Sequence, residues 1–225
     1  MADRVVVITG ATGKLGPAVA RRFADDGSRL GLVARSEDEV DELLESLPGG
    51  RERHAGFAID LDDPEATLAG AEAVRDRFGP PSVLLHLVGG YIGGTSFGDT
   101  ELNVWRELFD LNVMTTVHAL RAFLPDIRAA EHGRIVTVST PLAGAPVTEV
   151  AAYAASKASV ESLTLSVARE LAGTTATANV ILVRTINDQK PTHTRPAEIA
   201  AALAWLCSPA AGPVNGQRIP LVGRA

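Results

Sequence analysis

The sequence predicts an α/β fold with one doubly wound parallel sheet of about seven strands and helices on both faces. Short runs rich in Val, Ile and Leu alternate with longer amphipathic segments along the chain. Strands that read as continuous apolar runs are typical of parallel strands buried on both faces. No linker or change of composition divides the chain, so we expect residues 1–225 to form a single domain.

The first third of the chain alternates three predicted strands with three predicted helices. The run at 5–9 is β-branched, too short for a helix and closed by a glycine turn. Residues 15–26 place apolar side chains on one helical face and charged side chains on the other. Pro48-Gly49-Gly50 ends one helix, and Pro64 opens another. The other elements predicted here are strands at 30–34 and 55–59 and helices at 37–47 and 64–78.

The rest of the chain continues this alternation. A helical stretch covers 101–130, and we expect an interruption near Pro125 because proline lacks the amide hydrogen that a helix interior uses. A second long helix covers 153–171. The other predicted elements are strands at 83–88, 134–139, 179–183 and 217–221 and a helix at 196–207.

Composition and charge exclude several classes of protein. The formal net charge of −6 provides no basic surface for nucleic acid. No apolar run reaches the ~20 residues that span a bilayer, and the first residues lack the layout of a signal peptide. The single cysteine, Cys207, cannot form an internal disulfide, which fits a cytoplasmic location. The five histidines are scattered and lack the close pairing of a metal site, so we expect no metal. The partner that we expect is a small-molecule substrate.

A glycine-rich loop joins the first predicted strand to the first helix, and it reads Thr9-Gly10-Ala11-Thr12-Gly13-Lys14-Leu15-Gly16. Glycine permits a tight turn there and lets backbone N–H groups approach a pyrophosphate at the positive end of the helix. Alone, such a loop can be only a turn, but its place in an alternating α/β chain favours a dinucleotide site. The residues predicted to form it are Gly10, Thr12, Gly13, Lys14, Leu15 and Gly16.

Two cations favour NADP(H) over NAD(H) as the cofactor. Arg35 follows the second strand, where an acidic residue would bind the ribose 2′-hydroxyl of NAD and a cation favours a 2′-phosphate. Lys14 can add a charge from the facing loop; the alternative is that both are solvated surface cations. Asp60 either accepts from the adenine amino group or caps the helix that Pro64 opens. Residues after other strands complete the predicted cofactor site: Leu61, Val88, Gly89, Gly90 and Ile186.

The stretch Tyr153-Ala154-Ala155-Ser156-Lys157 puts a phenol and an ammonium group four residues apart on one helical face. Tyrosine, with an ordinary pKa near ~10, is a poor acid–base at neutral pH, and a neighbouring cation stabilises its phenolate. Such a tyrosine can give a proton to a carbonyl or imine as hydride arrives, or remove one in the reverse direction.

With these motifs the sequence resembles the short-chain dehydrogenase/reductase family over essentially its whole length. The resemblance implies a Rossmann-type domain with Tyr153 as catalytic acid–base, and with Lys157 lowering its pKa and holding the nicotinamide ribose. Asn112 would support a water-linked proton relay. The family's catalytic serine falls on Thr140, directly after Ser139, and both remain candidates. The resemblance also implies a homodimer or homotetramer, built through the helices at 101–130 and 153–171.

The sequence also departs from the family pattern. Gly10 and Gly13 are separated by two residues instead of three, and His86-Leu87-Val88-Gly89 replaces Asn-Asn-Ala-Gly. Val183-Arg184 replaces Pro-Gly, and about a dozen residues lead from there to the next helix, too few for a helical lid. We therefore expect an open or differently covered site. With the glycines around Tyr91, these features look like the dihydropteridine reductase branch, which reduces a flat pterin without the usual serine.

Three functions follow as hypotheses. The first is NADPH-dependent hydride transfer to a C=O or C=N bond, or its reverse, with Tyr153 handling the proton. The second is a dihydropteridine- or quinone-type reductase, in which Tyr91 lines the pocket for a flat substrate. The third is a non-catalytic regulator that senses NADP(H), motivated by the missing serine and Pro-Gly and opposed by the intact Tyr153 and Lys157.

Overall fold

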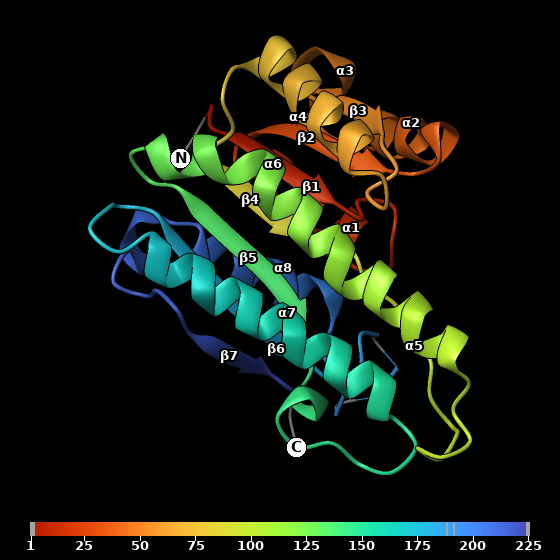
Figure 1. Ribbon diagram of the computed structural model, residues 1–225. Coiled ribbons are helices and arrows are strands. Elements are labelled where there is room, and N and C mark those ends of the chain that lie inside the picture. Colours follow the sequence, from red (N-terminus) through yellow and green to blue (C-terminus); the bar gives the residue numbers. More distant parts are fainter. Residues whose placement is uncertain (1–2, 188, 191, 224–225) are drawn as a thin grey trace.

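The computed structural model describes residues 3–187, 189–190 and 192–223, and it confirms the predicted fold class. Seven strands form one sheet in the order β3-β2-β1-β4-β5-β6-β7, and all neighbouring strands run parallel (Figure 1). The chain therefore winds outward in two directions from β1 and β4. The strands are β1 Val5–Thr9, β2 Arg29–Ala34, β3 Ala55–Ala58, β4 Val83–His86, β5 Arg134–Ser139, β6 Thr177–Val183 and β7 Arg218–Leu221.

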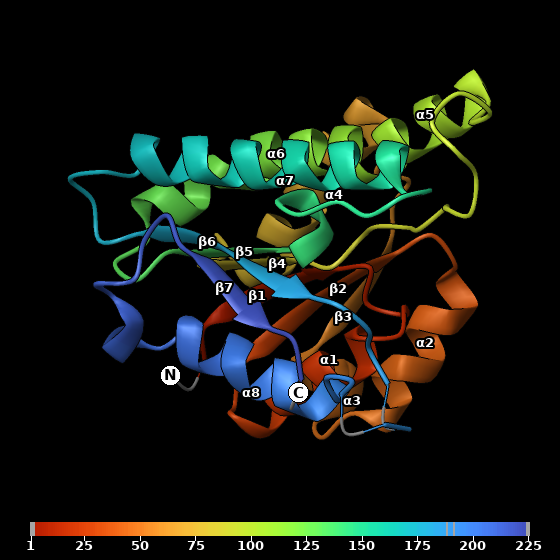
Figure 2. The same ribbon diagram turned by 90° about the horizontal axis from the view of Figure 1, so that it is seen from below.

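Helices cover both faces of the sheet. In Figure 2, α1, α2, α3 and α8 lie below the sheet, whereas α4, α6 and α7 lie above it. This two-sided cover follows from right-handed crossovers that leave the central strands in opposite directions. The helices are α1 Gly16–Asp25, α2 Glu37–Ser46, α3 Gly50–Arg53, α4 Pro64–Phe78, α5 Leu102–Phe109, α6 Thr115–Ala129, α7 Ala151–Glu170 and α8 Pro196–Leu206.

The core consists of two hydrophobic clusters, one on each face of the sheet. Phe23 of α1 and Leu203 of α8 belong to the first cluster, and Phe123 of α6 and Val167 of α7 belong to the second. All residues of β1 and β4 are buried. Because both faces of these strands are covered, their sequences show no alternation of polar and apolar residues.

The predicted interruption near Pro125 is wrong: Pro125 lies inside α6, and the irregularity is a π-helical turn at Asp110–Met114. Arg75 of α4 supports the helix around the proline. It donates at 2.8 Å to the carbonyl of Ala122 and, also at 2.8 Å, to the carboxylate of Asp126. This contact with α4 stabilises the turn in which proline removes a main-chain hydrogen bond.

The structure differs from the prediction at other places as well; for example, β6 and α7 each begin two residues earlier than expected. The sequence did not predict α3, a single turn that begins after Gly49. Gly49 and Gly50 have φ of 86° and 43°, a region that glycine adopts without strain. These glycines end the preceding helix, as predicted, and they also allow the helical turn that follows. The fourth strand ends at His86 instead of Val88.

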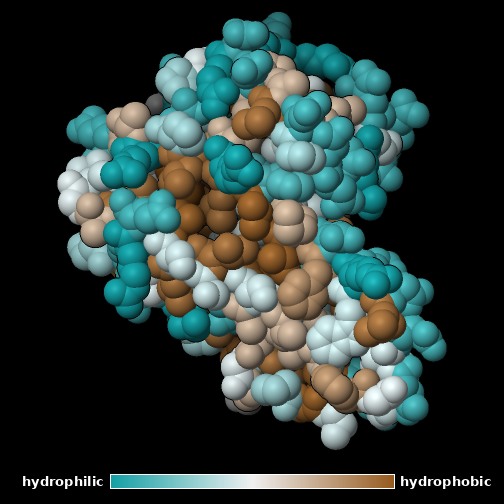
Figure 3. Space-filling model, in the orientation of Figure 1, coloured by the Kyte–Doolittle hydropathy of each residue, from teal (hydrophilic) through white to brown (hydrophobic). Residues whose placement is uncertain are grey.

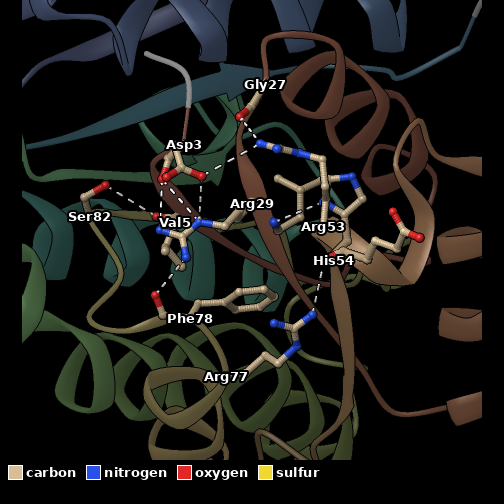
Figure 4. A network of polar contacts seen from close by, with 11 residues as sticks. Asp3, Val5, Gly27, Arg29, Arg53, His54, Arg77, Phe78 and Ser82 are labelled. Atoms are coloured by element: carbon tan, nitrogen blue, oxygen red, sulfur yellow. Dashed lines mark hydrogen bonds and ion pairs between the residues drawn. The ribbon is translucent and has the colours of Figure 1, made fainter.

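Polar contacts tie the amino ends of the strands together (Figure 4). Arg29, at the start of β2, pairs with the carboxylate of Asp3 at 3.1 Å and donates to the Phe78 carbonyl at 3.1 Å. Arg53 donates to the Gly27 carbonyl at 2.8 Å, and His54 Nδ1 accepts from the Leu30 amide at 3.2 Å. These contacts are structural, and they lie at the edge of the sheet opposite to the site described next.

Candidate functional site

The candidate site lies at the carboxyl edge of the sheet, where parallel α/β sheets bind ligands at the point of strand reversal. Two cavities meet there. The first, which we call the β2-side cavity, has a volume of about 440 Å³ and is lined from the ends of β1 to β4. The second, the β6-side cavity, has a volume of about 730 Å³ and is lined from the ends of β1, β4, β5 and β6 and from α7. In Figure 3 the surface is notched on this side, between α2 and α5.

The glycine loop connects the two cavities. Gly10 and Gly13 line both of them, as do Leu87 and Gly89. Gly10 has φ of +71°, and a Cβ there would lie 3.1 Å from the backbone nitrogen of Val88. The loop therefore needs glycine both for its turn and for its close approach to the segment after β4.

The other predicted loop residues divide between the cavities. Thr12 lines the β2-side cavity, and Lys14 and Leu15 line the β6-side cavity. Gly16 lines neither; a Cβ there would lie 2.0 Å from the Ala11 carbonyl oxygen, so this glycine serves packing at the start of α1. The structure does not bring Lys14 together with Arg35 in one cavity, contrary to our expectation.

The predicted adenosine-side residues line the β2-side cavity. Arg35, Leu61 and Val88 all belong to it, and Arg35 is exposed. Asp60 also belongs to it, and its carboxylate accepts from the Asp62 amide at 3.1 Å. The alternative reading of Asp60 as the helix cap is wrong, because Asp63 caps α4 by accepting from two backbone amides.

Tyr153 and Lys157 lie on consecutive turns of α7, and both line the β6-side cavity. The ammonium group of Lys157 donates to the Val138 carbonyl at 3.1 Å, and burial lowers the pKa of Lys157 to about 8. A Cβ at position 89 would lie 2.5 Å from this ammonium nitrogen, so Gly89 permits the close approach of loop and lysine.

The pKa of Tyr153 differs from what the resemblance implied. Burial raises this pKa, a hydrogen bond with the Thr140 side chain lowers it in part, and the Tyr91 phenol raises it further. The Tyr91 and Tyr153 rings pack edge to face, with centroids 4.9 Å apart. Desolvation of the phenolate outweighs stabilisation by neighbours, so the phenol keeps its proton at neutral pH.

Asn112 lies fully buried in the π-helical turn and connects three segments. Its amide oxygen accepts from the Gly90 amide at 2.9 Å, and its amide nitrogen donates to the Gly90 carbonyl at 3.2 Å and to the Ser156 hydroxyl at 3.0 Å. Ser156 donates in turn to the Tyr153 carbonyl at 2.9 Å. Asn112 therefore fixes the loop after β4 against the helix that carries Tyr153 and Lys157.

The structure separates the two hydroxyl candidates after β5. Ser139 contributes to the cavity wall, but its hydroxyl donates to the buried carboxylate of Glu161 at 2.7 Å. Glu161 also pairs with Arg218 of β7. The Thr140 side chain lowers the pKa of Tyr153, and its hydroxyl accepts from the Leu142 amide at 3.4 Å.

Two residues near the site were not assigned a role from the sequence. His86 is fully buried; its Nδ1 lies 2.8 Å from the Thr9 hydroxyl, and its Nε2 has no partner among the described residues. Burial, with Lys157 nearby, lowers the pKa of His86 to about 3. Arg184 lines the β6-side cavity. The sequence contained a signal for each of them: His86 is a polar residue at the end of an apolar strand, and Arg184 is an arginine where the family pattern has glycine.

The segment between β6 and α8 has no helix among its described residues. Ile186 and Asn187 from this segment line the β6-side cavity, and Ile186 forms a parallel bridge with Thr194.

Among the described residues, no group of three or more His, Cys, Asp or Glu side chains is arranged to hold a metal. None of the helices described has the length and hydropathy needed to span a bilayer.

With this fold and site, the chain belongs to the short chain dehydrogenase family, whose model matches residues 4–195. The family is one of oxidoreductases. The chain is 30% identical over 241 residues to meso-2,3-butanediol dehydrogenase from Serratia marcescens, covering 99% of this chain and 94% of that protein. It is 27% identical over 238 residues to a 3-oxoacyl-acyl-carrier-protein reductase from Vibrio cholerae, covering 98% and 96%.

A solved structure gives the same fold with a nucleotide. The chain superposes with a TM-score of 0.89 on a short chain oxidoreductase from Pseudomonas aeruginosa PAO1 that has an atypical catalytic center and NADPH bound. The two are 25% identical, and the match covers 98% of this chain and 96% of that one. The predicted family is thereby confirmed.

Proposed function

We propose that this protein is an NADPH-dependent reductase of C=O or C=N bonds in which Tyr153 donates the proton. The observation that carries this proposal is the position of Tyr153 and Lys157 on successive turns of α7, where both line a cavity that is continuous with the glycine loop. NADPH supplies the hydride when it is bound.

The residues fit a dinucleotide that lies across both cavities. The glycine cradle at Gly10 would be filled by a Cβ, and Gly13 lines both cavities at the start of α1, as a pyrophosphate site requires. We assign the adenosine half to the β2-side cavity, with Arg35 facing the 2′-phosphate and Asp60 facing the adenine, and the nicotinamide half to the β6-side cavity, with Ile186. The NADPH in the Pseudomonas structure supports this cofactor, with NADH as the weaker alternative.

The side chains around Tyr153 support a role as proton donor. Burial raises the pKa of its phenol, so the group carries a proton at neutral pH. We propose that Tyr153 gives this proton to the substrate oxygen or nitrogen, and that Thr140 donates a hydrogen bond beside it. Lys157, mostly protonated at pH 7 because its pKa is about 8, stabilises the remaining phenolate. Asn112 holds these groups in place and supports the return of the proton.

The experiment is NADPH oxidation by the wild type and by Tyr153→Phe, with 3-oxoacyl thioesters, simple ketones, quinones and quinonoid dihydropterin as substrates. We expect kcat to fall roughly 10²- to 10⁴-fold in Tyr153→Phe, as for loss of a general acid, with NADPH affinity unchanged. Tyr91→Phe is the matched control, because it removes the other phenol that lines the cavity and keeps the ring. Tight NADPH binding without turnover on any substrate would favour a regulator that senses NADP(H).

Tyr91 favours a second candidate, a reductase of flat conjugated substrates such as quinones or dihydropterins. This ring is 61% exposed, lines the β6-side cavity and packs against Tyr153. A flat substrate can stack on such a ring. Turnover of quinones or dihydropterins, lost in Tyr91→Ala and kept in Tyr91→Phe, would distinguish this function from reduction of simple ketones.

We also propose that the chain acts as one cofactor-binding domain in a homodimer or homotetramer. In Figure 3, hydrophobic residues gather over α6 and α7, the helices that the resemblance implies for assembly. Light scattering at micromolar concentration tests this, and a monomeric mass would refute it. The thiol of Cys207 is buried, and burial raises its pKa to about 12, as expected for a packing residue that does not react.

A further inference from the structure

The two cavities differ in the charges that line them. In the β2-side cavity Arg35 is accompanied by Glu39, Asp60 and Asp62. The charged residues described around the β6-side cavity are all cations: Lys14, Lys157 and Arg184. The protein as a whole carries a formal net charge of −6, so this positive lining does not follow from its composition.

Two of the three cations already have partners in the proposed function. Lys157 lies one turn after Tyr153 on α7 and donates to the Val138 carbonyl. Lys14 directly follows Gly13, one of the two loop glycines that line both cavities, and so lies where we assign the pyrophosphate. Arg184 is left over: it is exposed and forms no hydrogen bond or ion pair with any described residue.

The strand order keeps Arg184 away from the pyrophosphate position. Three inter-strand steps separate β1 from β6. At a spacing of ~4.8 Å per step the ends of these two strands lie about 14 Å apart, so Arg184 begins well away from the glycine loop, at the opposite side of the β6-side cavity.

The strand register places Arg184 on the substrate side of the site. Ser139 pairs with Leu182, so Thr140 comes level with Val183 and Arg184 lies one residue further out. Arg184 and Tyr153 line the same cavity.

We propose that Arg184 binds an anionic oxygen group, a carboxylate or phosphate, of the substrate. This rests on the proposed function, and it specifies the substrate class as carbonyl or imine compounds that carry a negative charge. A guanidinium group binds such oxygens through two parallel hydrogen bonds. No carboxylate among the described lining residues of the β6-side cavity competes for it.

The test uses two probes that share ring and aldehyde and differ by one charge: 4-formylbenzoate and its methyl ester. In Arg184→Gln we expect kcat/KM for 4-formylbenzoate to fall roughly 10- to 100-fold, mainly through KM, and that for the ester to change less than about threefold. The matched control is Arg21→Gln, which removes an exposed arginine of α1, and we expect neither probe to be affected. NADPH affinity should stay the same in both variants.

A binding measurement separates this inference from the proposed function. Calorimetric titration of 4-formylbenzoate into the NADPH complex of Tyr153→Phe needs no turnover, and adding Arg184→Gln should weaken the binding roughly 10-fold or more. Binding that depends on Arg184, without turnover in the wild type, would refute the proposed function and keep the anion site. Equal binding of ester and carboxylate, or no binding of either, would overturn the anion site. Loss of NADPH affinity in Arg184→Gln would assign the arginine to the cofactor and overturn it as well.

Discussion

Replacement of Asn112 by alanine tests whether one buried amide holds the candidate site together. The side chain is fully buried and makes three hydrogen bonds, two to the backbone of Gly90 and one to the Ser156 hydroxyl. At a net ~1 kcal/mol per hydrogen bond, we expect the free energy of unfolding to fall by about 3 kcal/mol. This is a large part of the ~5–15 kcal/mol that stabilises a typical domain.

Urea unfolding followed by tryptophan fluorescence measures this loss. Asn103→Ala is the matched control: Asn103 is an exposed residue of α5 whose side chain makes a single hydrogen bond, accepting from the Val104 amide at 2.9 Å. For the control we expect a loss of at most about 1 kcal/mol. If Asn112→Ala is no less stable than Asn103→Ala, the three hydrogen bonds do not contribute as the structure implies.

Three further predictions follow from single positions. Arg35→Asp should raise the Kd of NADPH roughly 10- to 100-fold and that of NADH by less than about threefold; equal losses would reject its role at the 2′-phosphate. Gly16→Ala brings a Cβ within 2.0 Å of a backbone oxygen, so the free energy of unfolding should fall by about 2 kcal/mol or more, whereas Gly144→Ala, with nothing within 4 Å, should be neutral in the same urea titration. His86 has a pKa of about 3 in the folded protein against an ordinary 6.5, so only the unfolded state binds this proton between those values. Stability should therefore fall by about 1.4 kcal/mol per pH unit as the pH drops through this window. His86→Asn should remove that slope, and the exposed His132→Asn should keep it.

Most of the fold could be predicted because the relevant signals are local. The strands β1 and β4 are continuous apolar runs, and parallel strands covered on both faces require them. Tyr153 and Lys157 are four residues apart within a helical pattern, so their shared orientation follows from helix geometry alone. The glycine loop is contiguous in sequence, and its position between β1 and α1 indicates its role.

The features that could not be predicted depend on contacts between distant segments. The π-helical turn contains Asn112, whose side chain is bonded to Gly90, 22 residues earlier in the chain. No local sequence signal identifies this turn. Pro125 gave a local signal for an interrupted helix, but α6 continues through the proline, where Arg75 donates to the Ala122 carbonyl.

The same holds for the two neighbouring hydroxyl groups. Ser139 and Thr140 differ in role because a carboxylate on α7, Glu161, accepts the first hydroxyl, and the second lies beside Tyr153. Ser139 is the last residue of β5 and Thr140 the first after it, so their different partners depend on the position of α7 and not on any signal in their own sequence.

The charge distribution of the site bears on the direction of the proposed reaction. Burial raises the pKa of Tyr153 and lowers that of Lys157 to about 8. Desolvation thus favours the neutral form of each group, and at neutral pH the phenol still has a proton to give while the lysine still carries most of its charge. In the proposed mechanism, the Lys157 ammonium group stabilises the phenolate, the product of proton donation, more than the neutral phenol. Oxidation would instead require Tyr153 to begin as phenolate, the form that burial disfavours. If Tyr153 has the proposed role, this arrangement favours reduction at neutral pH, and oxidation becomes accessible only as the pH rises toward the raised pKa of the phenol.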